Sequence, residues 1–477
     1  MDIRPPQFFS NDSIAEHTIE QSDTRMNALS NVIQGFSDVE FNGFFEIDTT
    51  ISKIIDGGYK RVALQFPDHF LRYAASIAER IERESKAKMF ILADTSYRSC
   101  CVDFLTAEHA KVDCLIHYGD ACLSECSNAI PVFYVFGDLS INRKAFIDAI
   151  KAHSCAFSKN CLLLYDSIYA NSANILINII TEIIDCRLFH CEIVDRTRTP
   201  IISEGSSIIS LGRQIGAEFV DVADVTVIFV GDEQSALLPL WLMTNINCTK
   251  VFSFSPLTSE SSFSRSSANK LLRRRLYLVE KVRDANTLAL VVGTVGVEGH
   301  REAIERTREL CKNAAKKLYV LSVGKVNVAK LSNFATDIDA FILLSCPFGV
   351  MLDTSDYYRP IVSLFEAEIA LNPSKEWAAA AGWIAEFGCF LSDSIGTPSG
   401  DDADMSLITG KLRSRHSGQC EQRNHQSDVM LYTAGDYFID RSWKGLDDSC
   451  TSDQEVIKIC EGRSGIASSY AYEPINK

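Results

Sequence analysis

One pattern occurs three times in the chain and constrains its fold more than any other feature. Each copy begins with an Asp, continues as an apolar run typical of a buried β-strand, and ends in a small or polar turn. The copies are Asp113–Asp120, Asp224–Gly231 and Asp339–Cys346, and they start 111 and 115 residues apart. A repeat of that length is a whole domain rather than a solenoid unit, whose period is about 20–50 residues. The pattern therefore predicts triplicated domains.

The residues around these copies alternate between strand-like and helix-like patterns. Strands are expected at 61–66, 89–93, 114–117, 132–136, 161–165, 193–194, 208–211, 224–231, 250–254, 288–292, 318–323 and 339–345. Helices are expected at 47–55, 69–84, 102–109, 172–184, 271–285, 300–316, 328–334 and 361–370. Alternating strands and helices favour parallel sheets with helices on both faces. The predicted fold is α/β, with three homologous domains, each a mainly parallel sheet flanked by helices.

This organisation divides the 477 residues into five parts. An N-terminal extension covers 1–44, and the three domains cover 45–155, 156–285 and 286–391. Residues 392–477 form a C-terminal insert and tail, and the insert, 392–428, is rich in Ser, Gly, Asp and Arg. That composition predicts partial disorder, because it offers too few apolar residues for a core.

Charge and hydropathy exclude two classes of protein. The net charge of −15 argues against direct nucleic-acid binding, which needs clustered Lys and Arg. The N-terminus has no basic region followed by an apolar run, so no secretory signal is expected. The longest apolar stretch, Ile175–Ile184, is too short to cross a bilayer. The chain is expected to be cytoplasmic, without membrane contact.

The chain has sixteen Cys, and a few of them follow the predicted strands closely. Cys100 or Cys101, Cys122 and Cys346 lie just past the carboxyl ends of strands, the edge where open parallel sheets bind ligands. If the first and third domains face each other, three thiolates converge. Seven of the remaining Cys have simpler interpretations: Cys114, Cys161, Cys186, Cys191 and Cys248 as small buried hydrophobes, and Cys420 and Cys450 as parts of polar segments.

Three Cys without a matching His favour soft, all-sulfur ligation. A cubane 4Fe-4S cluster takes four ligands, so three thiolates leave one iron open to a small molecule or solvent. Zinc is the competing metal, although its usual two close Cys pairs are missing from the sequence. Unligated thiols that are simply adjacent remain a third reading.

Two further motifs have simpler interpretations. Gly293–Gly299 follows a predicted strand but lacks the Lys-Ser/Thr of a phosphate-binding loop, so a plain strand-to-helix turn is expected. Arg273, Arg274 and Arg275 form a basic run, interpreted as a solvated helix face. His117 lies within an apolar strand and is interpreted as a core His rather than a base.

Several segments resemble the diphthamide biosynthesis family, in particular the second subunit of its eukaryotic 3-amino-3-carboxypropyl transferase. Besides Cys346, they are Arg61–Asp68, Lys88–Asp94, Ser99–Asp103, His117–Ser124, Gly324–Phe334, Tyr358–Pro360, Ser406–Gly410 and Arg441–Leu446. The resemblance covers roughly residues 45–390 and resumes in the tail. It implies three α/β domains around a 4Fe-4S cluster. It also implies a part in the first step of diphthamide synthesis, in which the 3-amino-3-carboxypropyl group of S-adenosylmethionine moves to a His of elongation factor 2.

The family's first, catalytic subunit has a middle-domain Leu-Gly-Cys turn, whereas this sequence has Leu211-Gly212-Arg213. The chain is therefore similar to the second, accessory subunit, in which Cys122, Cys346 and one of Cys100 and Cys101, with Cys100 favoured, are the implied ligands. The implied partners are the catalytic subunit, in a heterodimer, and an electron donor protein. The implied role is to help keep the partner's cluster reduced. The alternative is a structural, non-redox partner, and Arg213 argues against independent catalysis.

Overall fold

The computed structural model describes residues 29–92, 98–126, 130–194, 207–232, 235–350, 354–377, 382–396, 404–410 and 412–413. The predictions for residues 1–28, for Cys420 and Cys450 and for the tail beyond 413 lie outside these residues. The chain divides into two units, Met1–Glu421 and Gln422–Lys477. All described residues belong to the first unit, which alone is discussed below.

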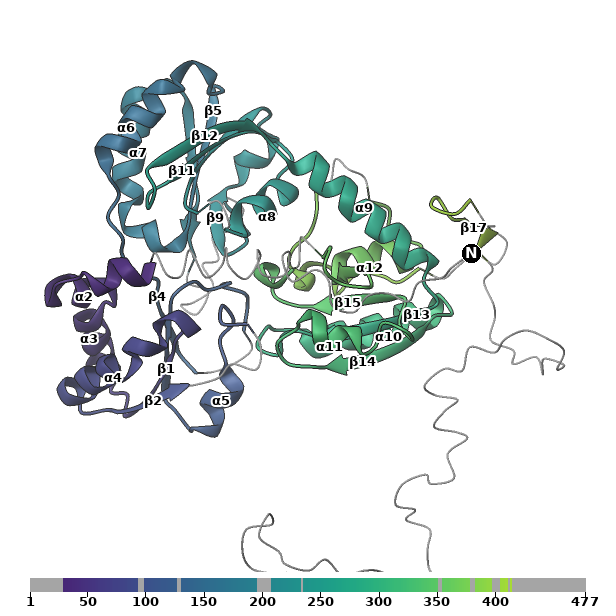
Figure 1. The fold of residues 1–477 in the computed structure, drawn as a ribbon, viewed down its shortest axis with the longest axis horizontal. Coiled ribbons are helices and arrows are strands. Elements are labelled where there is room, and N and C mark those ends of the chain that lie inside the picture. The colour runs from purple at the N-terminus through teal and green to yellow at the C-terminus, as the bar shows by residue number, and fades with distance from the viewer. Residues whose placement is uncertain are drawn as a thin grey trace, which may run out of the picture. The chain divides into compact units, whose positions relative to one another are not determined.

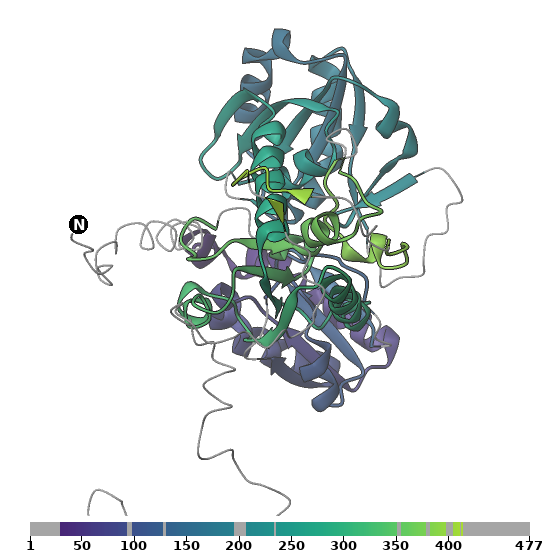
Figure 2. The same cartoon turned by 90° about the vertical axis from the view of Figure 1, so that its right-hand side faces the viewer.

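Three α/β sheets follow one another along the chain, coloured purple to blue, teal and green in Figures 1 and 2. The first has the order β2-β1-β3-β4, and its strands are β1 (Arg61–Gln65), β2 (Lys88–Leu92), β3 (Cys114–Tyr118) and β4 (Val132–Val135). The third repeats this order as β14-β13-β15-β16, with β13 (Thr287–Val292), β14 (Lys317–Ser322), β15 (Ala340–Leu344) and β16 (Ile361–Ser363). All pairings in both sheets are parallel.

The second sheet has the order β12-β11-β10-β5-β6. Its strands are β5 (Asn160–Tyr165), β6 (Arg187–His190), β10 (Val225–Val230), β11 (Cys248–Ser255) and β12 (Glu260–Arg265). Only the edge strand β12 runs antiparallel to its neighbour. The remaining described strands form two small antiparallel sheets. One sheet consists of β7 (Glu192–Ile193), β8 (Ser207–Ser210) and β9 (Arg213–Gly216). The other consists of β17 (Asp404–Met405) and β18 (Leu412–Arg413). The predicted α/β fold with mainly parallel sheets is confirmed.

The α-helices are α2 (Asp38–Phe44), α3 (Ile47–Gly57), α4 (Leu71–Ser85), α5 (Phe104–His109), α6 (Arg143–Ala152), α7 (Ala173–Ile183), α8 (Leu237–Thr244), α9 (Ala268–Asp284), α10 (His300–Asn313), α11 (Val328–Ser332) and α12 (Leu364–Leu371). Residues 29–34 are also helical. Short 3₁₀ turns are η1 (Asp68–Phe70), η2 (Ser154–Ala156), η3 (Ser167–Ser172), η4 (Ala217–Asp221), η5 (Pro347–Gly349) and η7 (Phe387–Phe390). In the described part of the chain, no helix has the length and apolarity that spanning a membrane requires.

Alternate residues of each central strand enter two different cores. In β1, Val62 and Leu64 pack with α3 and α4, whereas Ala63 packs with α5 on the opposite face. In β13, Leu288 and Leu290 join a core that includes α9, α10 and α12, while Ala289 packs beside α11. Because side chains of a strand alternate between faces, each of these sheets is covered on both sides.

In two of the three copies of the sequence repeat, the Asp side chain accepts hydrogen bonds from backbone N–H groups at the start of a neighbouring strand. Oδ2 of Asp113 accepts hydrogen bonds from the backbone N–H groups of Lys60 and Arg61, both at 3.0 Å, where β1 begins. Oδ2 of Asp339 accepts equivalent bonds, both at 2.9 Å, from Asn286 and Thr287 at the start of β13. Asp224 departs from this arrangement and accepts from the hydroxyls of Ser158 and Thr249. The first and third domains thus share a structural detail that the second lacks.

Two sequence expectations need correction. The expected helix 361–370 begins as a strand, because the buried, mostly β-branched residues of β16 pair with β15, and α12 begins only at Leu364. The expected solvated face of the Arg run holds for Arg273 and Arg274 but not for Arg275, which is buried. Its Nη2 donates to Oε2 of Glu366 at 2.6 Å, and this ion pair joins α9 to α12.

Candidate metal centre

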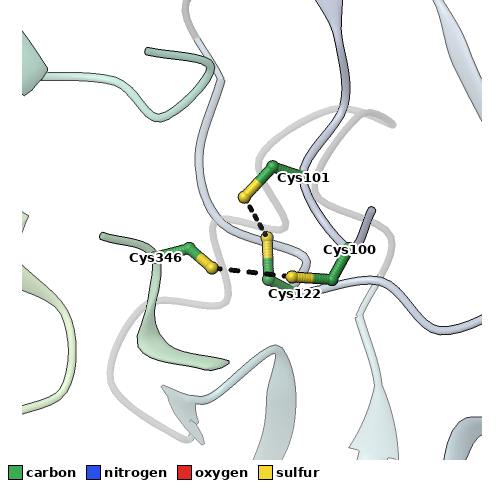
Figure 3. A group of neighbouring side chains, drawn as sticks. All are labelled: Cys100, Cys101, Cys122 and Cys346. Carbon is green, nitrogen blue, oxygen red and sulfur yellow. Dashed lines mark hydrogen bonds between the residues drawn. The ribbon is translucent and has the colours of Figure 1, made fainter. Parts of the chain in front are cut away.

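Four Cys side chains from distant parts of the sequence meet in one place. The sulfur atoms of Cys100, Cys101, Cys122 and Cys346 all lie within 4.8 Å of one another, and their side chains point toward a common centre (Figure 3). The sulfur atoms of Cys100 and Cys346 are 3.7 Å apart, and those of Cys101 and Cys122 are 3.9 Å apart. Within the described ranges, no other group of three or more His, Cys, Asp or Glu is placed to hold a metal ion. The predicted convergence of thiols takes place, and it includes both adjacent Cys.

The parallel sheets explain this convergence. Cys122 comes four residues after β3, and Cys346 comes two residues after β15. Cys100 and Cys101 lie in the connection between β2 and α5. All of these positions are past the carboxyl ends of their strands, which share one edge in a parallel sheet. The repeat of strand order in the first and third sheets gives each sheet such an edge.

Two side chains at the ends of central strands hold the loop that carries Cys100 and Cys101. Nε2 of Gln65, the last residue of β1, donates to the carbonyl oxygen of Cys101 at 2.8 Å, and its Oε1 accepts from the backbone N–H of Asp103 at 3.0 Å. Nε2 of His117 in β3 lies 3.0 Å from the carbonyl oxygen of Ser99. Gln65 is 1% exposed and His117 is fully buried, so both act in a dry environment.

The protonation of His117 follows from these contacts. Because a carbonyl only accepts, Nε2 of His117 carries the proton, and Nδ1 has no hydrogen-bond partner. Burial lowers the pKa of His117, which is therefore neutral. The sequence predicts a core His, and His117 is buried as predicted. Its hydrogen bond to Ser99 also helps to position the loop that carries Cys100 and Cys101.

The turn Gly293–Gly299, which follows β13 of the third sheet, contacts the group of Cys side chains. Oγ1 of Thr294 donates to Sγ of Cys101 at 3.7 Å, and the backbone N–H of Glu298 donates to the carbonyl oxygen of Glu125 at 2.8 Å. A Cβ on Gly296 would lie 2.6 Å from the carbonyl oxygen of Val102, so only Gly fits there. The segment is a strand-to-helix turn, as expected, and it also joins the two domains.

Arg98 adds a second link between these domains. Its Nη1 donates to the carbonyl oxygen of Phe348, two residues after Cys346, at 3.1 Å. Phe348 and Val297 pack against the sulfur atoms and give the centre an apolar surround. Gln65, Thr294 and Arg98 were not singled out from the sequence, because each acts on residues that only the fold brings near. Of these three residues, only Gln65 could have been selected from the sequence, because it lies at the end of a central strand.

Hydrogen bonding shifts the pKa values of the three buried thiols, Cys101, Cys122 and Cys346, in different directions. Cys101, Cys122 and Cys346 are 6%, 5% and 1% exposed, whereas Cys100 is half-buried. Hydrogen bonds from Cys100 and then Cys101 hold the pKa of Cys122 well below its usual range. Hydrogen bonding with Cys100 raises the pKa of both Cys101 and Cys346. A metal ion that binds at this site displaces the protons of the thiols that become its ligands.

The donor set fits a soft metal centre. Sulfur ligands without imidazole or carboxylate are those of iron–sulfur clusters and of structural zinc. A single tetrahedral zinc with bonds of about 2.3 Å has sulfur–sulfur edges of about 3.8 Å. The separations of 3.7 and 3.9 Å between two pairs of these sulfur atoms match those edges. The site thus has the chemistry of either metal group and the spacing of a single ion.

A cavity of about 520 Å³ adjoins the centre. Charged and polar groups from all three domains line it, namely Asp68, Arg98, Asp120, Asp166, Arg213, Lys325 and Ser345. Lys325 and Asp68 form an ion pair across it at 3.6 Å. Of the four converging Cys, only Cys100 is part of the cavity wall.

The middle domain reaches this region without contributing a sulfur. Leu211 and Gly212 both have positive φ, and a Cβ on Gly212 would lie 2.7 Å from Cβ of Leu123, the neighbour of Cys122. The next residue, Arg213, is 2% exposed, and its Nη2 donates to Oγ of Ser167 at 3.2 Å and to the carbonyl oxygen of Tyr165 at 3.3 Å. Arg213 thus occupies the position after the Leu-Gly turn at which the sequence resemblance implies a Cys in the family's catalytic subunit.

Comparison with known proteins places the chain in a family. Residues 66–382 match the family model described as "Putative diphthamide synthesis protein". The chain is 42% identical over 485 residues to 2-(3-amino-3-carboxypropyl)histidine synthase subunit 2 of Caenorhabditis elegans, and the match covers 98% of each chain. It is 36% identical to the Xenopus laevis subunit 2, covering 92% of this chain and 94% of that relative.

Solved structures support the fold. The crystal structure of Dph2 from Pyrococcus horikoshii has a TM-score of 0.52 and 19% identity, and the match covers 75% of this chain and 96% of that chain. The crystal structure of the same protein with a 4Fe-4S cluster has a TM-score of 0.52 and 18% identity, covering 71% of this chain and 93% of that chain. With the family match and the near full-length relatives, these similarities show that the chain belongs to the diphthamide synthesis family, among its eukaryotic subunits 2.

Proposed function

We propose that this chain is the iron–sulfur subunit of the complex that carries out the first step of diphthamide synthesis. In that step the 3-amino-3-carboxypropyl group of S-adenosylmethionine is transferred to a His of elongation factor 2. The observation that carries the proposal is the meeting of four Cys sulfur atoms within 4.8 Å in a chain related to histidine synthase subunits. The proposed ligands are Cys122 and Cys346 together with Cys100 or Cys101.

The proposed role is accessory rather than catalytic. Held by these Cys, a 4Fe-4S cluster would supply one-electron chemistry between a reduced donor protein and the catalytic subunit. Arg213 supports this assignment, because it replaces a sulfur where the catalytic subunit is expected to have one. The proposed partners are that catalytic subunit, in a heterodimer, the donor protein and elongation factor 2, all in the cytoplasm.

The residues of this chain would serve that role in three ways. Gln65 and His117 hold the loop of Cys100 and Cys101 in place. Thr294 directs a hydroxyl at Sγ of Cys101, and hydrogen bonds to sulfur tune the potential of such centres. Phe348 and Val297 exclude water from the sulfur atoms. Each is a contribution of binding, orientation or environment rather than of covalent chemistry.

The deciding experiment is electron paramagnetic resonance of the anaerobic, dithionite-reduced chain, alone and with the catalytic subunit. A signal of a reduced 4Fe-4S cluster that disappears in Cys122→Ala is expected. Cys248→Ala, which removes a buried thiol outside the centre, is the matched control and should keep the signal. A chain that takes up neither iron nor sulfide but still supports the catalytic subunit would refute the redox role.

One observation favours a second candidate, a structural subunit that stabilises its partner without redox chemistry. The sulfur separations of 3.7 and 3.9 Å match the edges of a single tetrahedral zinc site, and structural zinc sites use four protein ligands. Metal analysis of the purified heterodimer separates the candidates. About one zinc per chain and no acid-labile sulfide would establish the structural role.

A further inference from the structure

A second cavity lies away from the metal centre, where helices of the first and second sheets meet. Its volume is about 500 Å³, and helices α2, α6 and α7, labelled in Figure 1, contribute to its wall. Most of the wall is apolar and partly aromatic, with Phe36, Phe44, Phe146, Ile175, Ile179 and Leu257 among its residues. Of the charged residues in the wall, Glu40 and Asp138 outnumber Arg143.

The described residues leave apolar side chains of this wall open to water. Val32 and Leu257 both line the cavity, and each is 39% exposed. Exposed apolar side chains that are grouped around a hollow, rather than scattered, mark a place where another apolar group packs. The cavity is therefore a docking site, and the question is which chain fills it.

The chain itself enters the described structure beside this cavity. The helix 29–34 begins at Leu29, and Leu29 and Ile33 belong to the same buried core as Phe44. Val32, on the same helix, lines the cavity. Three residues of an α-helix rise only about 4.5 Å, so residues 1–28 lead away from a point close to the cavity wall.

One part of residues 1–28 has the composition to fill an aromatic cavity. Phe8 and Phe9 are adjacent, and residues 1–28 contain no other Phe, Tyr or Trp. They follow Pro5-Pro6, whose restricted backbone lowers the conformational entropy that docking removes. Residues 10–28 can bridge back to Leu29, because a flexible chain of that length spans about 25 Å on average.

Charge selects the same part of the segment. Arg4 is the first basic residue of the chain, and it lies close to Phe8 in the sequence. Glu40 in the wall is ionised at neutral pH, since hydrogen bonds from the backbone N–H and then the hydroxyl of Ser37 lower its pKa. Residues 10–28 contain one Arg and four acidic residues, Asp12, Glu16, Glu20 and Asp23. That acidic stretch would meet Glu40 and Asp138 with like charge, whereas Arg4 meets them with the opposite charge.

We propose that the segment Arg4–Phe9 folds back into this cavity, with the rings of Phe8 and Phe9 inside it. Tilted and edge-to-face contacts with the aromatic rings of the wall, such as Phe36 and Phe146, stabilise this position. The wall combines α6, which follows β4 of the first sheet, with α7, which follows β5 of the second. The docked segment thus connects the two sheets, and the proposal is independent of the metal centre.

The first test is photo-cross-linking in the full chain, purified with its catalytic partner. Phe8→p-benzoylphenylalanine places a photoreactive ring at the proposed position, and mass spectrometry identifies the residues that it labels on irradiation. Labelling of α7 or of Leu257 is expected. The same photoreactive residue at Ile19, in the acidic stretch, is the control and should not label the cavity wall. Labelling from position 8 that is absent, or confined to other surfaces, would overturn the proposal.

A mixture of nitrogen-15-labelled and unlabelled chains shows whether the cross-link is internal. A segment that docks in its own chain gives cross-linked peptide pairs of a single isotope. Pairs that combine the two isotopes would mean that the cavity receives the N-terminus of a second copy. Cross-links to the catalytic subunit would mean that the segment serves the heterodimer interface instead, and either result refutes the proposal.

A charge placed in the cavity wall provides the second test. Leu257→Glu should lower the yield of the cross-link about tenfold or more, because losing the burial of one aromatic ring changes an equilibrium constant at least that much. Leu257 is partly exposed, so the fold should tolerate the change. Val39→Glu is the matched control, since Val39 lies on α2 but is 80% exposed and outside the cavity wall. Equal yields in the two variants would contradict docking in this cavity.

Hydrogen exchange gives a measurement without any photoreactive group. The double variant Phe8→Ala and Phe9→Ala should speed amide exchange in α7 about tenfold, because the helix loses the contact that holds it closed. Ile14→Ala with Ile19→Ala is the comparison and should leave α7 unchanged. Unchanged exchange in the Phe variant would refute the proposal. Iron content should stay the same in all of these variants, so the outcome does not bear on the iron–sulfur function.

Discussion

Sγ of Cys100 and Sγ of Cys346 lie 3.7 Å apart, although the two residues are separated by 246 positions in the sequence. The contact joins the first domain to the third, and Cys346 is the third domain's only sulfur in the group. Removing that sulfur should therefore affect both the metal centre and the joint between the domains.

Cys346→Ser should lose most of the bound metal, because a 1% exposed ligand has no substitute within reach among the described residues. Iron and sulfide analysis after anaerobic purification measures this. Cys311→Ser is the control, since Cys311 is equally buried but packs in an apolar core. Full iron retention in Cys346→Ser would exclude Cys346 as a ligand.

Gln65→Leu should loosen the loop that carries Cys100 and Cys101. The change leaves the carbonyl of Cys101 and the N–H of Asp103 without their partner, at a cost of about 1–3 kcal/mol in unfolding free energy. Loss of such supporting contacts typically weakens metal binding about 10–100-fold. Competition with a chelator measures the affinity, and Gln214→Leu, which removes an amide that donates to Oγ of Ser207, is the comparison. Equal affinities in the two variants would exclude a positioning role for Gln65.

Thr294→Val should lower the reduction potential of the centre without changing its metal content. The hydroxyl of Thr294 donates to Sγ of Cys101, and removing a hydrogen bond to sulfur destabilises the reduced, more negative state. A redox titration followed by paramagnetic resonance gives the potential, and Thr294→Ser should restore it. Thr307→Val removes another buried hydroxyl, which donates to the carbonyl of Ala303, and should leave the potential unchanged.

His117 should make the chain less stable in mild acid. Burial lowers its pKa in the folded state below the ordinary value of about 6.5, so the unfolded chain takes up the proton more readily. Its contribution to unfolding free energy is complete above about pH 6.5 and declines as the pH falls below that value. His117→Gln keeps a donor for the carbonyl of Ser99 but does not titrate. Denaturant unfolding of both metal-free proteins between pH 5 and 8 should show a smaller decline for the variant, and parallel curves would contradict this.

Asp113→Ala and Asp339→Ala should destabilise the chain by similar amounts, about 1 kcal/mol each, because each carboxylate accepts two backbone hydrogen bonds at the start of a strand. Denaturant unfolding measures the loss. The double variant should show the sum, since the two sites lie in different sheets. A large difference between the two single variants would mean that the repeated detail has different roles in the two domains.

The sequence was sufficient to predict the strands that carry the site, because buried parallel strands are continuous apolar runs with clear ends. The strands expected at 114–117 and 339–345 correspond to β3 and β15, and they place Cys122 and Cys346 just past strand ends. Both Cys then follow from the rule that ligands collect at the carboxyl edge. That the sulfur atoms of both Cys100 and Cys101 lie at the same centre did not follow, because adjacency alone suggests that one of two neighbours points away.

Elements without a periodic pattern were missed. Helix α8 is buried around most of its surface, so it has no polar face to reveal a helical period. Strand β12, with the sequence ESSFSR, is a polar edge strand whose only strong signal is its pairing with β11. The start of α12 carried an overlooked signal, since Ser363 and Glu366 form a capping box that marks the true first turn.

Arg275 shows a different limit of sequence reasoning. Three consecutive Arg suggested an exposed face, yet Leu272, Arg275 and Val279 fall on one side of α9 at helical spacing. Arg275 is buried because it pairs with Glu366, which lies 91 residues away in the sequence. No local sequence pattern indicates that partner. Buried charges in this chain are thus explained by pairs that only the assembled fold creates.

The division of the sulfur atoms between the first and third domains also sets an order of events during synthesis. The ribosome makes Cys100, Cys101 and Cys122 early, but the fourth sulfur, Cys346, emerges only after the entire middle domain has been translated. A nascent chain therefore holds an incomplete set of thiols for most of its elongation. The set of four sulfur atoms is therefore complete only after Cys346 has left the ribosome and the preceding strand, β15, has folded.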